Sequence, residues 1–485
     1  MKTLKTFIKN FTSLVLSRIF QQGLHVIFIA LLARYLGAEG FGIFAFCLSV
    51  VTLFCIFVNF GLNTLLVREI AKYKERASEL IGKALFIKIT FALVMIAGIS
   101  VYAYFAHMEK IFFFLLLIIS CYSFVDSMTD ILNSCFRAYE RMELEAFLSM
   151  FGSFFYVAGG IAAIWLKVSL IRIVIVLGIS YVLKFIFGIM LFFRRFPDCR
   201  HFGRNFRFDW PLLKMASVFA LVGGIGVIFG HTDKLMLGAL CGYGSVGWYA
   251  ATNKLLMTFF IIPSLFVAAI FPVFSRLHQD AIEKLKIAYV NSFYSLLTLG
   301  VIVGIISFMF SDLIIGLMYG KGFDQSILIL KVMAFYLIWQ FPNYVNGQMM
   351  VSINKERLFS MVYGFFTVLN IILNYILIIR FGFMGACYAT IFATGLGFVF
   401  YTCYIHRHLS IALDYMKLVK LTVSALCLVG ILLLALRMGI HFVWSIFVIA
   451  PVIYFSLVLI FRIFPRETLL MLFQCFSFSR KGIRA

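Results

Sequence analysis

Charged and amide side chains interrupt the first apolar run of this 485-residue sequence at helical spacing. Arg18 is followed by Gln22 four residues later and by His25 seven residues later, so the three side chains share one stripe of a helix. A charge at the centre of a bilayer costs at least about 2.5 to 3.5 kcal/mol on insertion scales. We therefore expect the stripe to face a watery cavity, with Arg18 as its strongest functional candidate.

Further charged and amide groups lie inside later apolar runs, and the same cost predicts that they line the cavity. They are Asn59, Asn63, Lys88, Asp126, Asp130 and Lys184 in the first half, and Asp233, Lys234, Lys254 and Lys331 in the second. Together with Arg18, the cations outnumber the carboxylates by six to three. This excess predicts an anionic ligand.

Simpler interpretations of these residues stay open. His25 can be a hydrogen-bonded packing residue instead of a proton-coupling group. Lys88 and Asp130 can reach the cytoplasmic interface with their charged ends. Asp233 and Lys234 can form a structural ion pair. Amides, including Asn370 and Asn374 farther along the chain, can serve to hold helices together.

The sequence contains no motif for catalysis or for a resident cofactor. We find no phosphate-binding loop, no metal-ligand spacing and no nucleophile with a general base, and the ten cysteines are scattered through apolar segments. We therefore expect no enzyme activity, no metal and no cofactor. A transmembrane gradient would have to supply energy, and a proton or sodium ion coupled through His25, Asp126 or Asp130 is one hypothesis.

Composition predicts an integral membrane protein, because 63% of the residues are hydrophobic and only 13% are charged. Apolar runs of about 20 residues span a bilayer as helices. Fourteen such runs lie near 11–33, 41–66, 80–104, 111–135, 146–166, 172–193, 212–240, 246–274, 287–310, 325–350, 358–379, 383–405, 418–436 and 442–461. The expected fold is all-α, with about fourteen transmembrane helices.

The loops between the runs predict the topology. Alternate loops differ in basic residues, with 29 Lys and Arg on one side and seven on the other. Lysine and arginine are retained in the cytoplasm, so we expect a multi-pass protein of the cell (inner or plasma) membrane with both termini cytoplasmic and an uncleaved first helix. The formal charge of +22 is spread over these short loops, which excludes a folded basic face for nucleic acid.

The polar connection at 194–211 predicts a division into two lobes. Leu36-Gly37 and the following 41–45 segment resemble Leu237-Gly238 and the 246–250 segment, each at the start of its half's second helix. Six helices per lobe would give two parallel repeats related by an axis along the membrane normal. The expected parts are an N-lobe at 1–193, a cytoplasmic linker at 194–211, a C-lobe at 212–405, two further helices at 406–465 and a basic cytoplasmic tail at 466–485.

Helix-breaking residues mark four candidate hinges. Gly223 and Gly224 lie in the seventh run, Pro263 in the eighth and Pro342 in the tenth. Close packing of helices at the glycines is the alternative.

Several short segments together resemble polysaccharide-transporter flippases of the O-antigen (Wzx) type. They are LARYLGAEGFG at 32–42, NFGL at 59–62, VREIA at 67–71, DKLMLG at 233–238, PVFSR at 272–276 and RFGFMGA at 380–386. The resemblance covers essentially the whole chain, through the order and spacing of the segments. It places the chain in the multidrug/oligosaccharidyl-lipid/polysaccharide (MOP) exporter superfamily.

The resemblance implies two six-helix lobes around a central cavity that works by alternating access. It implies flipping of a polyprenyl-pyrophosphate-linked oligosaccharide, an O-antigen or exopolysaccharide repeat unit of lipopolysaccharide synthesis, to the outer leaflet. The cationic cavity would receive the pyrophosphate, and Arg18 lies where related lipid II flippases carry an arginine. Membrane lipids would surround the protein, and a polysaccharide polymerase would be its partner. The two C-terminal helices are a departure from twelve-span members of the family.

Two other functions compete with this one. A MATE-like cation or drug antiporter of the same superfamily would need an acidic site in the first lobe, which only Asp126 and Asp130 offer. A membrane scaffold or glycosyltransferase is disfavoured, because the loops are short and nothing resembles a sugar-nucleotide site.

Overall fold

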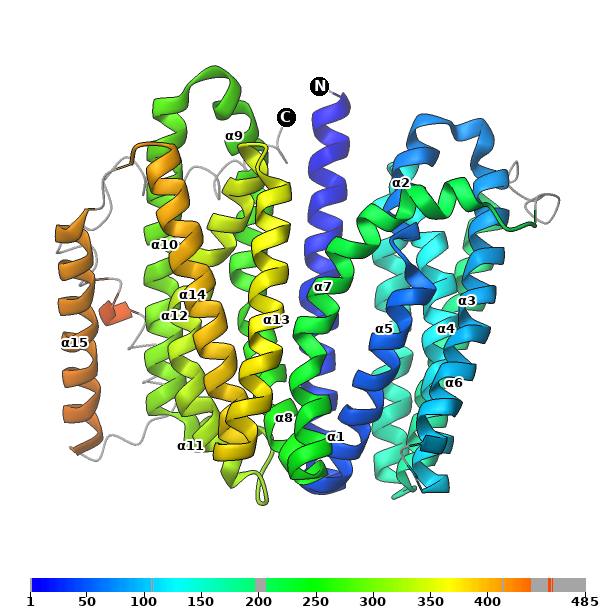
Figure 1. The fold of residues 1–485 in the computed structure, drawn as a ribbon, viewed down its shortest axis with the longest axis horizontal. Coiled ribbons are helices and arrows are strands. Elements are labelled where there is room, and N and C mark those ends of the chain that lie inside the picture. Colours follow the sequence, from blue (N-terminus) through cyan, green and yellow to red (C-terminus); the bar gives the residue numbers. More distant parts are fainter. Residues whose placement is uncertain are drawn as a thin grey trace. The chain divides into compact units, whose positions relative to one another are not determined.

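The computed structural model describes residues 2–105, 107, 109–196, 206–411, 414–437, 452–454 and 456, and this part of the chain is helical with no strand. Figure 1 labels these helices along the chain. Their bounds are α1 Lys2–Asn59, α2 Leu62–Lys72, α3 Ala77–Phe105, α4 Lys110–Ala138, α5 Met142–Trp165, α6 Leu170–Arg195, α7 Trp210–Cys241, α8 Tyr243–Phe259, α9 Ile261–Asp280, α10 Ile282–Met309, α11 Ser311–Met318, α12 Asp324–Ser352, α13 Glu356–Phe381, α14 Phe383–His408 and α15 Tyr415–Arg437.

The predicted all-α membrane fold is confirmed. Twelve helical segments of the described residues are long and apolar enough to cross a bilayer. The segment Val15–Lys72 contains the first two expected runs, which are separated by the kink at Gly37, so thirteen of the fourteen expected runs coincide with helices. The fourteenth run at 442–461 and the tail at 466–485 fall almost entirely outside the described residues.

The described residues group into two compact units. The first comprises 1–258, 315–329 and 367–390, and the second comprises 259–314, 330–366 and the described part of 391–485. This grouping does not test the predicted lobes, linker and C-terminal parts, which stay a prediction.

The predicted internal repeat has a structural counterpart inside the first unit. Gly37 and Gly242 both adopt left-handed, extended backbone angles, with φ/ψ of 69°/177° and 82°/169°. Each lies five residues before a second glycine, Gly42 or Gly247, on the following helical segment. The counterpart of Gly37 is therefore Gly242, and the sequence match to Gly238 was wrong by four residues.

The same two repeats touch through reciprocal glycines on α1 and α8. A Cβ atom added to Gly42 would lie 1.8 Å from the Tyr243 carbonyl oxygen, and one added to Gly247 would lie 1.9 Å from the Ala38 carbonyl oxygen. Ala38 and Tyr243 each precede their own glycine by four residues, so the contact is the same from both sides. Only glycine allows the two backbones to approach this closely.

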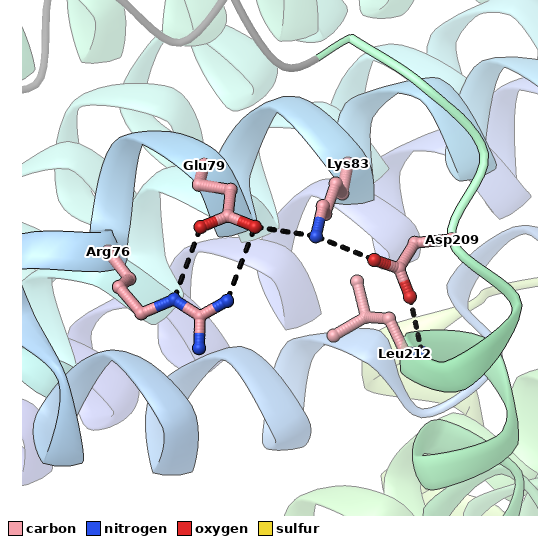
Figure 2. A network of polar contacts seen from close by, with 5 residues as sticks. All are labelled: Arg76, Glu79, Lys83, Asp209 and Leu212. Carbon is pink, nitrogen blue, oxygen red and sulfur yellow. Dashed lines mark hydrogen bonds and ion pairs between the residues drawn. The ribbon is translucent and has the colours of Figure 1, made fainter.

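A charged network fixes the start of α7 to α3 (Figure 2). Lys83 Nζ lies 2.6 Å from Glu79 Oε1 and 2.6 Å from Asp209 Oδ2, and Arg76 donates to Glu79. Asp209 also caps α7 by accepting from the Leu212 N–H at 2.8 Å. Partial burial acts to raise the pKa of Asp209, but the hydrogen bonds from Lys83 and Leu212 outweigh it and hold the pKa below its ordinary value.

We expect Gly42→Ala to destabilise the protein, because the new methyl group meets a carbonyl oxygen of the backbone and cannot be relieved by a side-chain rotation. The cost should be at least about 1 to 3 kcal/mol, as for other overpacked sites. Gly230→Ala is the matched control, since nothing lies within 4 Å of its Cβ position. Thermal unfolding midpoints in one detergent would measure both, and equal midpoints would contradict the proposed contact.

Candidate functional site

The predicted polar stripe of α1 lies beside α5 and α8 in the first unit. His25 Nε2 lies 3.3 Å from Ser153 Oγ, and its ring stacks on Tyr156 with centroids 5.0 Å apart. Gln22 donates to Thr258 Oγ1 at 3.3 Å. Arg18 is exposed, and its guanidinium has no hydrogen bond or ion pair to any described residue.

A polar cavity of about 190 Å³ opens beside this stripe. Side chains of four helices surround it, and nearly all of them carry a hydrogen-bonding group. The lining residues are Gln21 and His25 from α1, Asp126 from α4, Ser149, Gly152, Ser153 and Tyr156 from α5, and Ser180, Tyr181 and Lys184 from α6. The structure therefore brings together His25, Asp126 and Lys184, three of the residues named from the sequence.

The two opposite charges of this cavity neutralise each other. Lys184 Nζ donates to Asp126 Oδ1 at 2.8 Å. The lysine side chain runs over Gly152, where an added Cβ atom would lie only 2.6 Å from Lys184 Cδ. Gly152 thus makes room for the lysine stem to cross α5 and reach Asp126.

Lys88 lies in a second, closed cluster of the first unit. Its side chain is completely buried, and Nζ donates to Asn59 Oδ1 at 3.1 Å, Asn63 Oδ1 at 2.9 Å and both oxygens of Ser127 at 2.6 and 2.9 Å. Asn63 in turn donates to Asp130 Oδ2 at 3.3 Å. The interpretation that Lys88 extends to the interface is wrong, because four oxygen acceptors satisfy it inside the helix bundle.

Asp233 lies in a third cluster, which joins α7, α8, α13 and α14. Its carboxylate is buried and accepts from the Tyr249 hydroxyl, from Asn374 Nδ2 at 2.7 Å and from Thr390 Oγ1 at 3.2 Å. Asn374 Nδ2 also donates to Asn370 Oδ1 at 3.0 Å. All of these partners are neutral.

The alternative interpretation of Asp233 and Lys234 as a structural ion pair is wrong. No described carboxylate lies within 4 Å of Lys234 Nζ, which is instead 3.4 Å from His231 Nδ1. Adjacent helical residues point in different directions, which separates the two side chains.

The remaining predicted cations differ in their surroundings. Lys254 is half-buried on α8, has no hydrogen bond or ion pair from its side chain to a described residue, and lies within electrostatic range of His25. Lys331, in the second unit, pairs with Asp312 at 2.9 Å. Asp312 was not among the predicted charges, and it removes Lys331 from the unpaired cations.

Of the four predicted hinge residues, one closely follows a break between two helices and three lie well inside a helix. Gly223 has nothing within 4 Å of its Cβ position, and Gly224 faces Ile56 at 3.3 Å. Pro263 lies just after the break between α8 and α9, whereas Pro342 lies inside α12 without ending it. Their role as hinges stays a prediction.

Sequence reasoning missed the polar residues of α5 and α6 that complete the cavity. Ser149, Ser153 and Tyr156 follow one another at steps of four and three, which is the spacing of one helix face. That signal was present but weak, because serine and tyrosine also occur on lipid-facing and packed helix surfaces.

Within the described residues, no group of three or more His, Cys, Asp or Glu side chains could hold a metal ion.

Comparison with known proteins decides the family. The family model described as polysaccharide biosynthesis protein matches residues 7–278, more than half of the chain, and the model MatE matches residues 219–376. The chain belongs to the polysaccharide biosynthesis protein family. The predicted resemblance to a polysaccharide-transporter family is thereby confirmed.

Relatives and solved structures agree with this family. The probable low-salt glycan biosynthesis flippase Agl15 of Haloferax volcanii is 24% identical over 434 residues, which cover 86% of this chain and 88% of the relative. The lipid II flippase MurJ, in an inward closed conformation, is similar with a TM-score of 0.68 and 17% identity over 94% of this chain and 99% of its own. An inward-facing multidrug resistance MATE family transporter of the MOP superfamily has a TM-score of 0.66 and 15% identity. The match covers 82% of this chain and 96% of that transporter. At these identities the structures show a shared fold.

We expect Lys88→Met to destabilise this family member by about 3 kcal/mol or more, because it removes the buried ammonium donor shared by Asn59, Asn63 and Ser127 and one of the two lysines near Asp130. The matched control is Lys214→Met, at an exposed position of α7, which should change stability by less than about 0.5 kcal/mol. Unfolding monitored by circular dichroism would compare the two. An equally small effect of both changes would refute the buried network.

Proposed function

We propose that the protein is a flippase for a lipid-linked glycan. In this proposal it moves a polyprenyl-pyrophosphate-linked oligosaccharide, an O-antigen or exopolysaccharide repeat unit, from the cytoplasmic to the outer leaflet of the cell membrane by alternating access. Both termini are cytoplasmic, and the transported glycan passes to a polysaccharide polymerase. The family membership and the names of Agl15 and MurJ support the choice of cargo.

The observation that carries the proposal is the set of unpaired cations along α1 and α8. Among the described residues, neither Arg18 nor Lys254 has a carboxylate partner, whereas Asp126 is neutralised by Lys184. The contact between Gln22 and Thr258 holds these two helices side by side. Unpaired cations at bilayer depth are costly, and a pyrophosphate group would supply the missing negative charge.

The construction of α7 supports alternating access. Its start is fixed by the Lys83–Asp209 ion pair, and its end is fixed by the hydrogen bonds to Asp233. Between these ends, Gly223, Gly226 and Gly230 have nothing within 4 Å of their Cβ positions. A helix that is held at both ends and has open space at three of its central glycines can bend there, and Gly224 packs on Ile56 of α1 in the same stretch.

A MATE-like cation or drug antiporter is the second candidate, and the match of the MatE model to residues 219–376 favours it. Such a protein would bind a cation through an acidic group of the first lobe. Asp126 already has Lys184 as its partner, and the adjoining stripe carries Arg18 and His25. The local charge therefore favours an anionic cargo.

We expect Arg18→Ala and Lys254→Ala to slow flipping of a fluorescent polyprenyl-pyrophosphate disaccharide in proteoliposomes by at least tenfold each, because each removes a charge-assisted contact with the pyrophosphate worth about 1.5 to 3 kcal/mol. Dithionite quenching of the outer leaflet would follow the movement. The control Arg172→Ala removes an exposed cation at the start of α6 and should flip at the native rate. Equal rates for all three variants, or export of cationic dyes by the native protein, would overturn the proposal.

A coupling cation, H⁺ or Na⁺, fits the Asp233 cluster better than His25, Asp126 or Asp130. The Asp233 carboxylate is buried and all of its hydrogen-bond donors are neutral, so a proton or a small cation can compensate its charge there. Carboxylate, amide and hydroxyl oxygens are also ligands suited to a hard cation. We include such coupling in the proposal, with no metal or organic cofactor.

Asp233→Asn should make flipping independent of the coupling gradient, because an amide cannot exchange a proton or attract a cation as a carboxylate does. Flipping rates with imposed Na⁺ or pH gradients, with and without ionophores, would be compared for both proteins. Native flipping that ignores both gradients would remove the coupling hypothesis while leaving the flippase proposal intact.

A further inference from the structure

The cavity beside His25 differs from the pyrophosphate region in size and charge. Its volume of about 190 Å³ is below the roughly 300 to 1,000 Å³ of pockets that hold drug-sized ligands. It can therefore accept one small ring, but neither an oligosaccharide nor a lipid chain.

The charges of the cavity disfavour a phosphate. The Asp126–Lys184 pair contributes one negative and one positive charge, and His25 is held by Ser153 and by its stack on Tyr156. Asp126 and Lys184 still present oxygen and nitrogen atoms for hydrogen bonds. A lining that is rich in donors and acceptors and has no excess charge suits an uncharged polyhydroxylated ligand.

Two tyrosine rings are held ready for such a ligand. Tyr156 stacks on His25, and Tyr181 stacks on Tyr122 with centroids 5.0 Å apart and an interplanar angle of 1°. The two tyrosines meet edge to face at 5.8 Å, and neither phenol hydroxyl has a hydrogen-bond partner among the described residues. Rings with fixed orientation and unused hydroxyls can contact the C–H face of a sugar and bind its hydroxyl groups.

We infer that this cavity is a subsite for one uncharged sugar residue of the transported glycan. The inference rests on the proposed function and extends it. The head group of the cargo binds at two places. Its pyrophosphate lies near Arg18 and Lys254, and one neutral sugar lies among Tyr156, Tyr181 and the serines of α5. In this subsite the Asp126–Lys184 ion pair binds hydroxyl groups of the sugar and gives no preference for a charged ligand.

The test uses the full-length native protein in detergent and saturation-transfer difference NMR with simple methyl glycosides. The probes are the methyl glycosides of glucose, galactose and N-acetylglucosamine, together with methyl glucuronide, glucosamine and inorganic pyrophosphate. We expect saturation transfer to at least one neutral glycoside. Tyr181→Phe and Ser149→Ala should each weaken its apparent affinity by roughly 3- to 10-fold, the effect of one lost hydrogen bond.

The matched control is Tyr122→Phe, which removes a phenol hydroxyl from the ring behind Tyr181 that does not line the cavity. It should leave glycoside binding unchanged. The glycoside subsite is refuted by absent saturation transfer from every neutral glycoside, by preference for the charged sugars, or by equal losses in Tyr181→Phe and Tyr122→Phe. Because Arg18→Ala is scored by flipping and these variants by glycoside binding, the two failures are distinguishable, and failure of the subsite leaves the flippase proposal standing.

Discussion

The backbones of α1 and α8 touch through Gly42 and Gly247, and the residues assigned to the cargo lie on α8 and on the segment of α1 that precedes its kink at Gly37. On α1 these are Arg18, Gln22 and His25, and on α8 they are Lys254 and Thr258. A side chain larger than hydrogen at either glycine would force these two backbones apart. The reciprocal geometry also shows that this contact is made by corresponding parts of the two repeats. The hydrogen bond between Gln22 and Thr258 is a second contact, which joins α8 to the α1 segment before the kink.

The cost of burying charge sorts the ionisable residues into those that stabilise the structure and those left for a ligand. Lys88 is satisfied by amide and hydroxyl oxygens, Lys331 by Asp312, and Lys184 by Asp126. Asp233 has only neutral donors. After these are accounted for, Arg18, Lys234 and Lys254 have no carboxylate within 4 Å among the described residues. Arg18 and Lys254 lie on α1 and α8, whereas Lys234 lies on α7 beside His231.

The apolar runs predicted most of the helices, because hydropathy over about 20 residues directly reflects the thickness of a bilayer. The stripe on α1 was also predictable, since its members are close in sequence. The partners of buried charges were not, because Asp233 meets Asn374 and Thr390 across more than 140 residues. The repeat was misaligned by four residues at Gly238, since two short glycine motifs competed and only the backbone angles of Gly242 distinguish them. The cavity residues of α5 and α6 were missed because serines and tyrosines carry little hydropathy signal.

The central claim is that the pyrophosphate of a lipid-linked glycan binds at Arg18 and Lys254. A cryo-electron microscopy structure of the protein with a bound polyprenyl-pyrophosphate oligosaccharide would test it most directly. The account predicts density for both phosphates within hydrogen-bonding distance of the Arg18 guanidinium and the Lys254 ammonium. Phosphate density elsewhere, with these two side chains turned toward acyl chains, would contradict it.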